Sequence, residues 1–180
     1  MINPTKILDF WFKECNPKIW FKKDQEFDNL IKTKFQKIFE YCLENKINNN
    51  SIIRENCLSW IIVLDQFIRN IYRNQIKSFS GDEKALKLSK IAIKKSFLIC
   101  NQYYYNSFFL MPFKHSEKRS DHKFSLPFFK KYTNKKTYDS ALRHKKVIET
   151  FSRYPHKNEI LGRKSTISEL EFLKLPGSKF

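Results

Sequence analysis

Apolar residues recur at steps of three and four along almost every long segment of this 180-residue chain. That spacing places them on one face of an α-helix, so each segment can bury one side and expose the other. It is found over residues 4–13, 24–46, 55–72, 82–100, 103–111 and 141–153. No run alternates between apolar and polar side chains, as a half-buried strand requires. The sequence therefore predicts an all-α fold.

Residues that start or stop helices set the predicted boundaries. Ser80 or Asp82 is placed to cap the helix over residues 82–100, and Thr166-Ile167-Ser168-Glu169 has the pattern of a capping box. Interruptions are expected at three further places: Pro112, Pro127 and residues 134–139. Short connections of this kind favour antiparallel neighbours, and we expect about seven or eight helices.

The chain has enough apolar side chains for a sizeable core, since 41% of its residues are hydrophobic. Its length is within the usual size of one domain, so we expect a single helical domain over residues 1–180. No uncharged apolar run reaches the roughly 18 residues of a membrane span, and the N-terminal residues lack a signal-peptide pattern. We therefore expect a cytoplasmic protein. The dispersed cysteines fit buried reduced thiols: Cys15, Cys42, Cys57 and Cys100.

The formal net charge of +17 does not by itself indicate that the protein binds nucleic acid. Lys outnumbers Arg by 28 to 7, a bias that codons rich in A and T produce without any ligand. Residues 111–146 are nevertheless distinct, because they hold 11 Lys and Arg and only three acidic residues. Aromatic residues at positions 124, 128, 129 and 132 lie among these cations, a mixture that RNA-binding surfaces use. A helix with buried aromatics and solvated lysines accounts for the pattern better.

The segment Leu-Asp-Gln-Phe-Ile-Arg-Asn at residues 64–70 places polar side chains on a helix that is otherwise apolar. Asp65 and Arg69 stand four residues apart and share a face, as do Gln66 and Asn70. Burying a charge without partners costs several kcal/mol, roughly, so these residues need internal partners. An internal salt bridge is the simpler interpretation for Asp65 and Arg69, and a functional site is the alternative.

Histidines and arginines accumulate in the C-terminal third. His144 lies in an apolar stripe, where a core histidine satisfied by one hydrogen bond is the simpler interpretation. The connection over residues 153–163 is rich in donors that could hold a carboxylate or phosphate, or equally could stitch the loop to the core: Arg153, His156, Lys157, Asn158 and Arg163. The pair His115 and Glu117 is too common a spacing to indicate zinc. We expect no metal and no cofactor.

Several strings resemble a bacterial domain-of-unknown-function family, number 924, in order and over nearly the whole chain. They are LDFWF at residues 8–12, LDQFIRN at 64–70, FFLMPFKHSE at 108–117, ALRHKKVI at 141–148 and the segment from residue 151 to the C-terminus. The resemblance implies an all-helical fold of the tetratricopeptide-like superfamily without an assigned activity. The chain departs from the family pattern at Ile68, Ser152, Lys157 and Ile167, where the family shows Pro, Gly, Arg and Pro.

The polar residues that the resemblance singles out include every residue of the candidate site named below. Three functional hypotheses follow. The first is a helical scaffold whose polar groove binds an acidic peptide or small anionic ligand. The second is an enzyme with acid–base groups at Asp65, Glu117, His144 and His156, and with ligand-binding residues at Arg69, Asn70, His115, Arg143, Arg153, Asn158 and Arg163. The third, less favoured, is an RNA-associated protein that uses residues 111–146.

Overall fold

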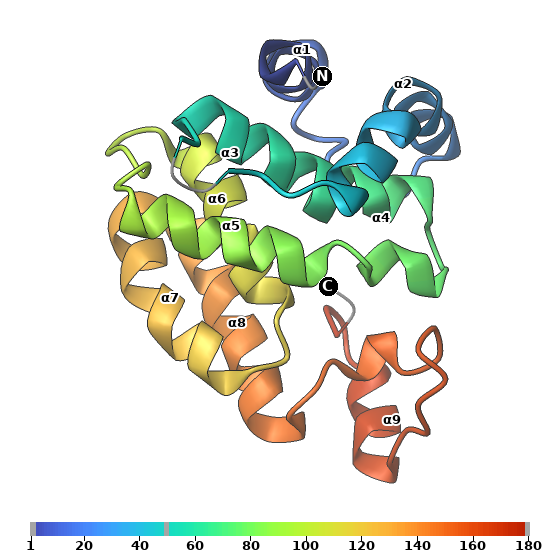
Figure 1. Ribbon diagram of the computed structural model, residues 1–180. Coiled ribbons are helices and arrows are strands. Elements are labelled where there is room, and N and C mark those ends of the chain that lie inside the picture. The colour runs from blue at the N-terminus through green and yellow to red at the C-terminus, as the bar shows by residue number, and fades with distance from the viewer. Residues whose placement is uncertain (1–2, 49–50, 179–180) are drawn as a thin grey trace.

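One long helix over residues 54–71 passes through the middle of the protein, and the other helices pack around it (Figure 1). The computed structural model describes residues 3–48 and 51–178. The long helix consists of α3 (Arg54–Ile61), a π-helical segment η2 (Ile62–Phe67) and α4 (Ile68–Ile71). Every residue from 57 to 68 is buried. The helix predicted over residues 55–72 is therefore present and lies at the centre of the fold.

The remaining helices form layers on either side of this central helix (Figure 1). Above it lie α1 (Pro4–Asp9), continued by the π turn η1 (Phe10–Glu14), and α2 (Gln25–Glu44). Below it lie α5 (Asp82–Lys94), α6 (Tyr103–His115), α7 (Arg119–Tyr132) and α8 (Lys135–Phe151). The C-terminal segment carries α9 (Ile167–Leu173), and two 3-10 turns are η3 (Ile76–Phe79) and η4 (Pro155–Lys157). Counting the central helix once, the described residues contain eight α-helices, which confirms an all-α fold.

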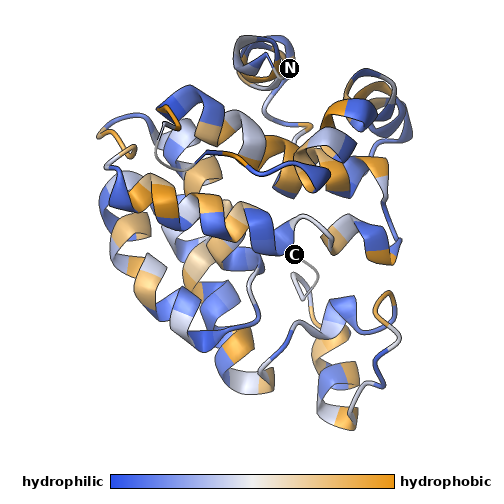
Figure 2. Ribbon diagram, in the orientation of Figure 1, coloured by the Kyte–Doolittle hydropathy of each residue, from blue (hydrophilic) through white to orange (hydrophobic). Residues whose placement is uncertain are grey.

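A continuous apolar core joins the helices from α1 to α8, and most helices show one apolar and one polar side (Figure 2). Aromatic rings are prominent in it: Phe10 and Phe35 lie 4.8 Å apart between centroids, and Phe35 and Phe67 lie 4.5 Å apart. A second, smaller cluster forms around Val147, Ile148 and Tyr154 near the C-terminal segment. The division into domains stays a prediction.

All four cysteines are free thiols, but Cys100 is exposed, whereas the sequence pattern indicated burial for each. None of the helices in residues 3–48 and 51–178 combines the length and the apolar character needed to cross a membrane.

Two predicted interruptions are wrong, because packing outweighs the effect of proline. Pro112 lies inside α6 and Pro127 lies inside α7. A proline removes one backbone hydrogen bond, but α6 is buried from residue 106 to residue 114, and that burial keeps the helix continuous. The break predicted over residues 134–139 is present but shorter: α7 ends at Tyr132 and α8 begins at Lys135. The Asn134 side chain caps α8 by accepting a hydrogen bond from the Thr137 N–H at 2.9 Å.

Helix ends at α5 also differ from the prediction. Gly81 is the N-cap, and neither Ser80 nor Asp82 caps the helix with its side chain. The helix ends at Lys94 rather than near residue 100, because Ser96 adopts a left-handed conformation (φ 56°) and the Phe97 N–H bonds back to the Ala92 carbonyl. The capping box is confirmed, with Thr166 and Glu169 bonded reciprocally.

We predict that Gly81→Ala destabilises the protein by roughly 3 kcal/mol or more, the upper range for forcing extra volume into a packed site. A Cβ atom at this position would lie 2.1 Å from the Leu64 carbonyl oxygen of the central helix, so the α5 N-terminus would have to move away. Urea unfolding measures the change, with the exposed Ser80→Ala as the control. Equal stability of both variants would show that the two backbones are not in close contact.

Candidate functional site

A buried carboxylate, Asp65, lies at the centre of the candidate site. It is fully inaccessible to solvent and belongs to the π-helical segment η2, whose wider turns redirect side chains and recur at functional sites. The Oδ1 atom of Asp65 lies 2.6 Å from Nδ1 of His115, at the end of α6. Gln66 donates from its side-chain amide to Oδ2, and Nη2 of Arg69 lies 3.8 Å from Oδ1. The i,i+4 pair predicted for Asp65 and Arg69 is therefore present, within a larger network.

The protonation states of this pair follow from its surroundings. Burial works to raise the pKa of Asp65, but the positive charge and hydrogen bond available from His115, with Arg69 and Gln66, hold that pKa below its usual value. Burial lowers the pKa of His115, against the opposing influence of Asp65. An ionised Asp65 and a neutral His115 result at neutral pH. The Nδ1–H of His115 then donates to Asp65, which leaves Nε2 as a base.

The outer nitrogen of His115 is accessible. Its side chain is about 20% exposed, and no group among the described residues bonds to Nε2. A base held by a buried carboxylate and open on its other nitrogen is the arrangement that acid–base enzymes use.

Two cations lie beside His115, held by Asp82 at the start of α5. Arg69 donates from Nη2 to Oδ1 of Asp82 at 2.6 Å, and Nζ of Lys157 lies 3.7 Å from Oδ2. Lys157 also donates to the backbone carbonyl of His115 at 3.1 Å. Both cations stack on the Phe79 ring. Asp82 thus fixes two positive groups next to the Asp65–His115 pair.

A forked ion pair between Arg163 and Glu117 connects the loop over residues 153–163 to the segment that follows α6. Arg163 donates from Nη1 and Nη2 to the two carboxylate oxygens of Glu117, at 2.7 and 3.0 Å. The Tyr154 N–H donates to the same carboxylate at 2.8 Å, and the Asn158 side chain accepts a hydrogen bond from Nε of Arg163 at 2.9 Å. Although burial opposes it, the Arg163 hydrogen bonds hold the pKa of Glu117 below its usual value. Glu117 is consequently a structural anchor, not a proton donor at neutral pH.

The two other histidines of the predicted set both lie close to the buried Tyr154 ring. The His144 ring centroid is 5.9 Å from that of Tyr154, and the His156 centroid is 5.4 Å from it. Nδ1 of His144 contacts the Ser140 carbonyl at 2.7 Å. Burial lowers the pKa of His144 to about 2 and that of His156 to about 4. Both are neutral at physiological pH, and the geometry of His144 fits the simpler interpretation of a core histidine.

Lys114 is a buried charged residue whose burial the sequence analysis did not predict. It is 7% exposed, and its Nζ has a single weak contact, 3.4 Å from Oγ of Ser140. Burial lowers its pKa to about 8. The residue was missed because Pro112 predicted the end of α6, which would have placed Lys114 in a solvated loop.

Three predicted residues lie outside this network. Asn70 donates to Asp28 of α2 at 2.8 Å rather than pairing with Gln66. Arg153 forms a forked ion pair with Glu169 of α9, at 2.6 and 2.7 Å. Arg143 is exposed on α8, where it acts on Lys114 only through its charge.

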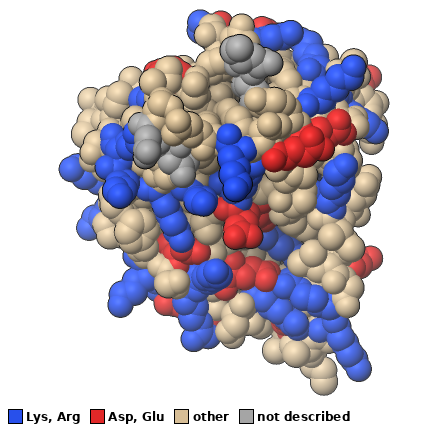
Figure 3. Space-filling model, viewed as in Figure 1, with Lys and Arg blue, Asp and Glu red and all other residues tan. Residues whose placement is uncertain are grey.

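On the face shown in Figure 3, acidic side chains group near the centre with Lys and Arg on several sides. Two cavities lie away from Asp65 and His115. One of about 560 Å³ is lined by residues of α1, α3 and the start of α6, and one of about 370 Å³ lies between α8 and α9. Within residues 3–48 and 51–178, no three His, Cys, Asp or Glu side chains gather as metal ligands would. The candidate site is therefore built from a carboxylate, a histidine and cations, away from both of these cavities.

These features define an all-helical protein with a buried Asp–His pair beside paired cations. The family model described as "Bacterial protein of unknown function (DUF924)" matches residues 7–177, and the chain belongs to that family. This confirms the resemblance inferred from the sequence strings. The tetratricopeptide-like relationship stays a prediction.

A solved structure with the same architecture supports the assignment. The protein of unknown function ATU0120 from Agrobacterium tumefaciens is 27% identical, with a TM-score of 0.79, and the match covers 95% of this chain and 96% of that one. Comparison with curated proteins gave no significant match.

We predict that Lys114→Met stabilises the protein at pH 7 by about 2–3 kcal/mol, from a pKa near 8 in the folded state against an ordinary value near 10.5. Because the unfolded chain binds the proton more tightly, the penalty is complete below pH 8 and disappears as pH rises from 8 to about 10.5.

Urea unfolding at several pH values measures the difference between wild type and variant. Lys118→Met, at an exposed lysine nearby, is the matched control and is expected to change neither stability nor its pH dependence. A Lys114→Met variant that is less stable at pH 7 would contradict a costly buried charge.

Proposed function

We propose that this protein is an enzyme that uses His115 as a general acid–base group on a small anionic substrate. The observation that carries the proposal is the 2.6 Å contact between the buried Asp65 carboxylate and Nδ1 of His115. It fixes the ring orientation and the tautomer, and it directs Nε2 outward. Asp65 is a positioning residue, and His115 replaces the roles that the sequence suggested for His144 and His156.

The cations beside His115 indicate the charge of the substrate. Arg69 contacts Asp82 and lies 3.8 Å from the ionised Asp65, whereas Lys157 has only a longer contact with Asp82, at 3.7 Å. The oxygens of Glu117 are bonded to Arg163 and to the Tyr154 N–H, so Glu117 acts on Lys157 only through its charge. Lys157 is therefore the less closely paired of the two cations. An anionic group that approaches Nε2 of His115 would meet both cations at a partly dehydrated surface, where charge-assisted hydrogen bonds are strongest.

A peptide-binding scaffold is a less well supported hypothesis. An acidic peptide needs a long positive groove, whereas the larger cavity is lined by Asp9 and Glu55 as well as by Lys13 and Arg54. The Asp65–His115 region, with Arg69 and Lys157 close to one histidine, suits a small ligand better.

Imidazole NMR spectra of isotopically labelled histidine test the arrangement directly. We predict that His115 has its proton on Nδ1, because Asp65 accepts it. Inorganic phosphate is the probe for the anion site, and its binding is expected to shift the Nε2 signal of His115 in the wild type. In Arg69→Met, the apparent affinity for phosphate obtained from this shift is expected to be at least tenfold lower. A proton on Nε2 of His115, or no response to phosphate, would contradict the proposal.

Activity is tested with a panel of small phosphate and carboxylate esters. His115→Gln is expected to lose about 100-fold or more of any turnover, the usual contribution of a general base. His122→Gln is the matched control, because the Nε2 atom of His122 is already bonded to the Ser116 carbonyl at 2.8 Å. Equal losses in both variants would indicate a structural role for His115.

A further inference from the structure

The acidic side chains of the α7–α8 hairpin, residues 118–151 with the preceding Glu117, are neutralised. Glu117 is paired with Arg163. Asp121 is buried, lies 2.6 Å from Nζ of Lys90 and accepts a hydrogen bond from Ser116. Asp139 lies 2.7 Å from Lys135, and Glu149 forms an ion pair with Lys145. The acids therefore offer little negative charge to solvent or to a ligand.

Most Lys and Arg side chains of the hairpin, in contrast, are not neutralised by an ion pair. Eight of them are exposed and form no ion pair with any described residue. Arg119 donates hydrogen bonds to the Ile148 and Glu149 carbonyls and to Ser152. The other seven are Lys118, Lys123, Lys130, Lys131, Lys136, Arg143 and Lys146. The lysine-rich composition alone does not produce such a face. On α2, the unpaired Lys32 and Lys37 are accompanied by exposed, unpaired Glu26 and Glu44. The hairpin thus presents a surplus of positive charge that α2 does not.

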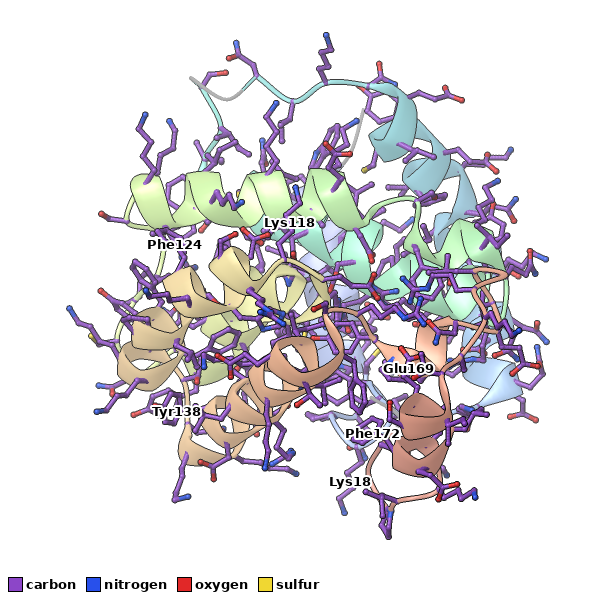
Figure 4. All side chains as sticks on the ribbon, turned by 90° about the horizontal axis from the view of Figure 1, so that it is seen from below. Lys18, Lys118, Phe124, Tyr138, Glu169 and Phe172 are labelled. Carbon is purple, nitrogen blue, oxygen red and sulfur yellow. The ribbon has the colours of Figure 1, made fainter. Side chains whose placement is uncertain are left out.

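An aromatic ring accompanies these charges. Phe124 is 49% exposed, although the sequence favoured buried aromatics throughout this segment. Its ring packs against those of Phe113 and Phe128, at 5.7 and 5.5 Å between centroids, and these contacts fix its orientation. Figure 4 shows Phe124 on α7, on the opposite side of the view from Glu169 and Phe172 of the C-terminal segment. Phe129, in contrast, is buried in the core.

We propose that the α7–α8 face binds single-stranded RNA, with the seven cations on its phosphates and Phe124 stacked on a base. Every base presents a π-face, so the binding is tolerant of sequence and depends strongly on salt. A double helix offers no unstacked base to Phe124. An anionic membrane fits less well, because Phe124 and Leu142 are the only large apolar side chains exposed on the hairpin, too few for insertion of a helix face.

The test is fluorescence anisotropy with labelled oligouridylate on the full chain, at salt concentrations from about 50 to 200 mM. Lys130→Glu/Lys131→Glu is expected to weaken binding at least tenfold and to flatten the salt dependence by roughly 0.7 per lost phosphate contact. Phe124→Ala is expected to weaken it about fivefold or more through lost stacking. The matched control, Lys32→Glu/Lys37→Glu on α2, makes the same change of net charge and is expected to change affinity less than twofold.

Four outcomes would overturn the proposal. They are no binding at low salt, an equal loss in the α2 control, binding of duplex RNA or polyglutamate as tight as that of oligouridylate, and binding to phosphatidylserine vesicles without binding to RNA. The positions are exposed, so the variants are expected to keep the wild-type circular dichroism spectrum, and an affinity loss then reports the surface itself. His115→Gln is expected to leave RNA binding unchanged, which separates this surface from the acid–base site.

Discussion

The ionised Asp65 carboxylate in the central helix is the constraint on which the surrounding structure depends. A buried charge without compensation costs several kcal/mol, roughly, so the fold must bring partners to it. Gln66 and Arg69 come from the same helix, but His115 comes from the end of α6. The position of α6 against the central helix is therefore set by polar contacts as well as by apolar packing.

From Asp65 the network extends outward as a chain of ion pairs and hydrogen bonds between charged side chains. Arg69 contacts Asp82 of α5, Asp82 contacts Lys157 of the C-terminal loop, and Lys157 returns to the His115 carbonyl. Buried ion pairs add little net stability, but a different packing of α5, α6 or the loop would leave several charges unpaired. Such a network favours one arrangement over others and keeps His115 in a defined orientation.

The sequence predicted what depends on local pattern and missed what depends on contacts between distant segments. Periodicity located the central helix and brought Asp65 and Arg69 onto one face. It could not show that tertiary burial carries α6 through Pro112, and so it placed Lys114 outside a helix. The left-handed conformation of Ser96 was equally hidden, because glycine is the usual signal for it. At Ser152, the glycine of the family pattern marks the position where the chain adopts the same conformation. The partner of Asn70 is on α2, 42 residues away, which no spacing rule predicts.

The positive charges of the chain are paired in one part of the molecule and unpaired in another. Around Asp65, cations are held by carboxylates and by burial, whereas on the α7–α8 hairpin they face solvent without partners. The two regions are connected through Lys114, because the charge of Arg143 on α8 contributes to the low pKa of that buried amine. A phosphate bound at Arg143 would offset this repulsion and raise the pKa of Lys114. Because an amine with a pKa of about 8 is already mostly protonated at pH 7, such binding would change the charge of Lys114 mainly above that pH.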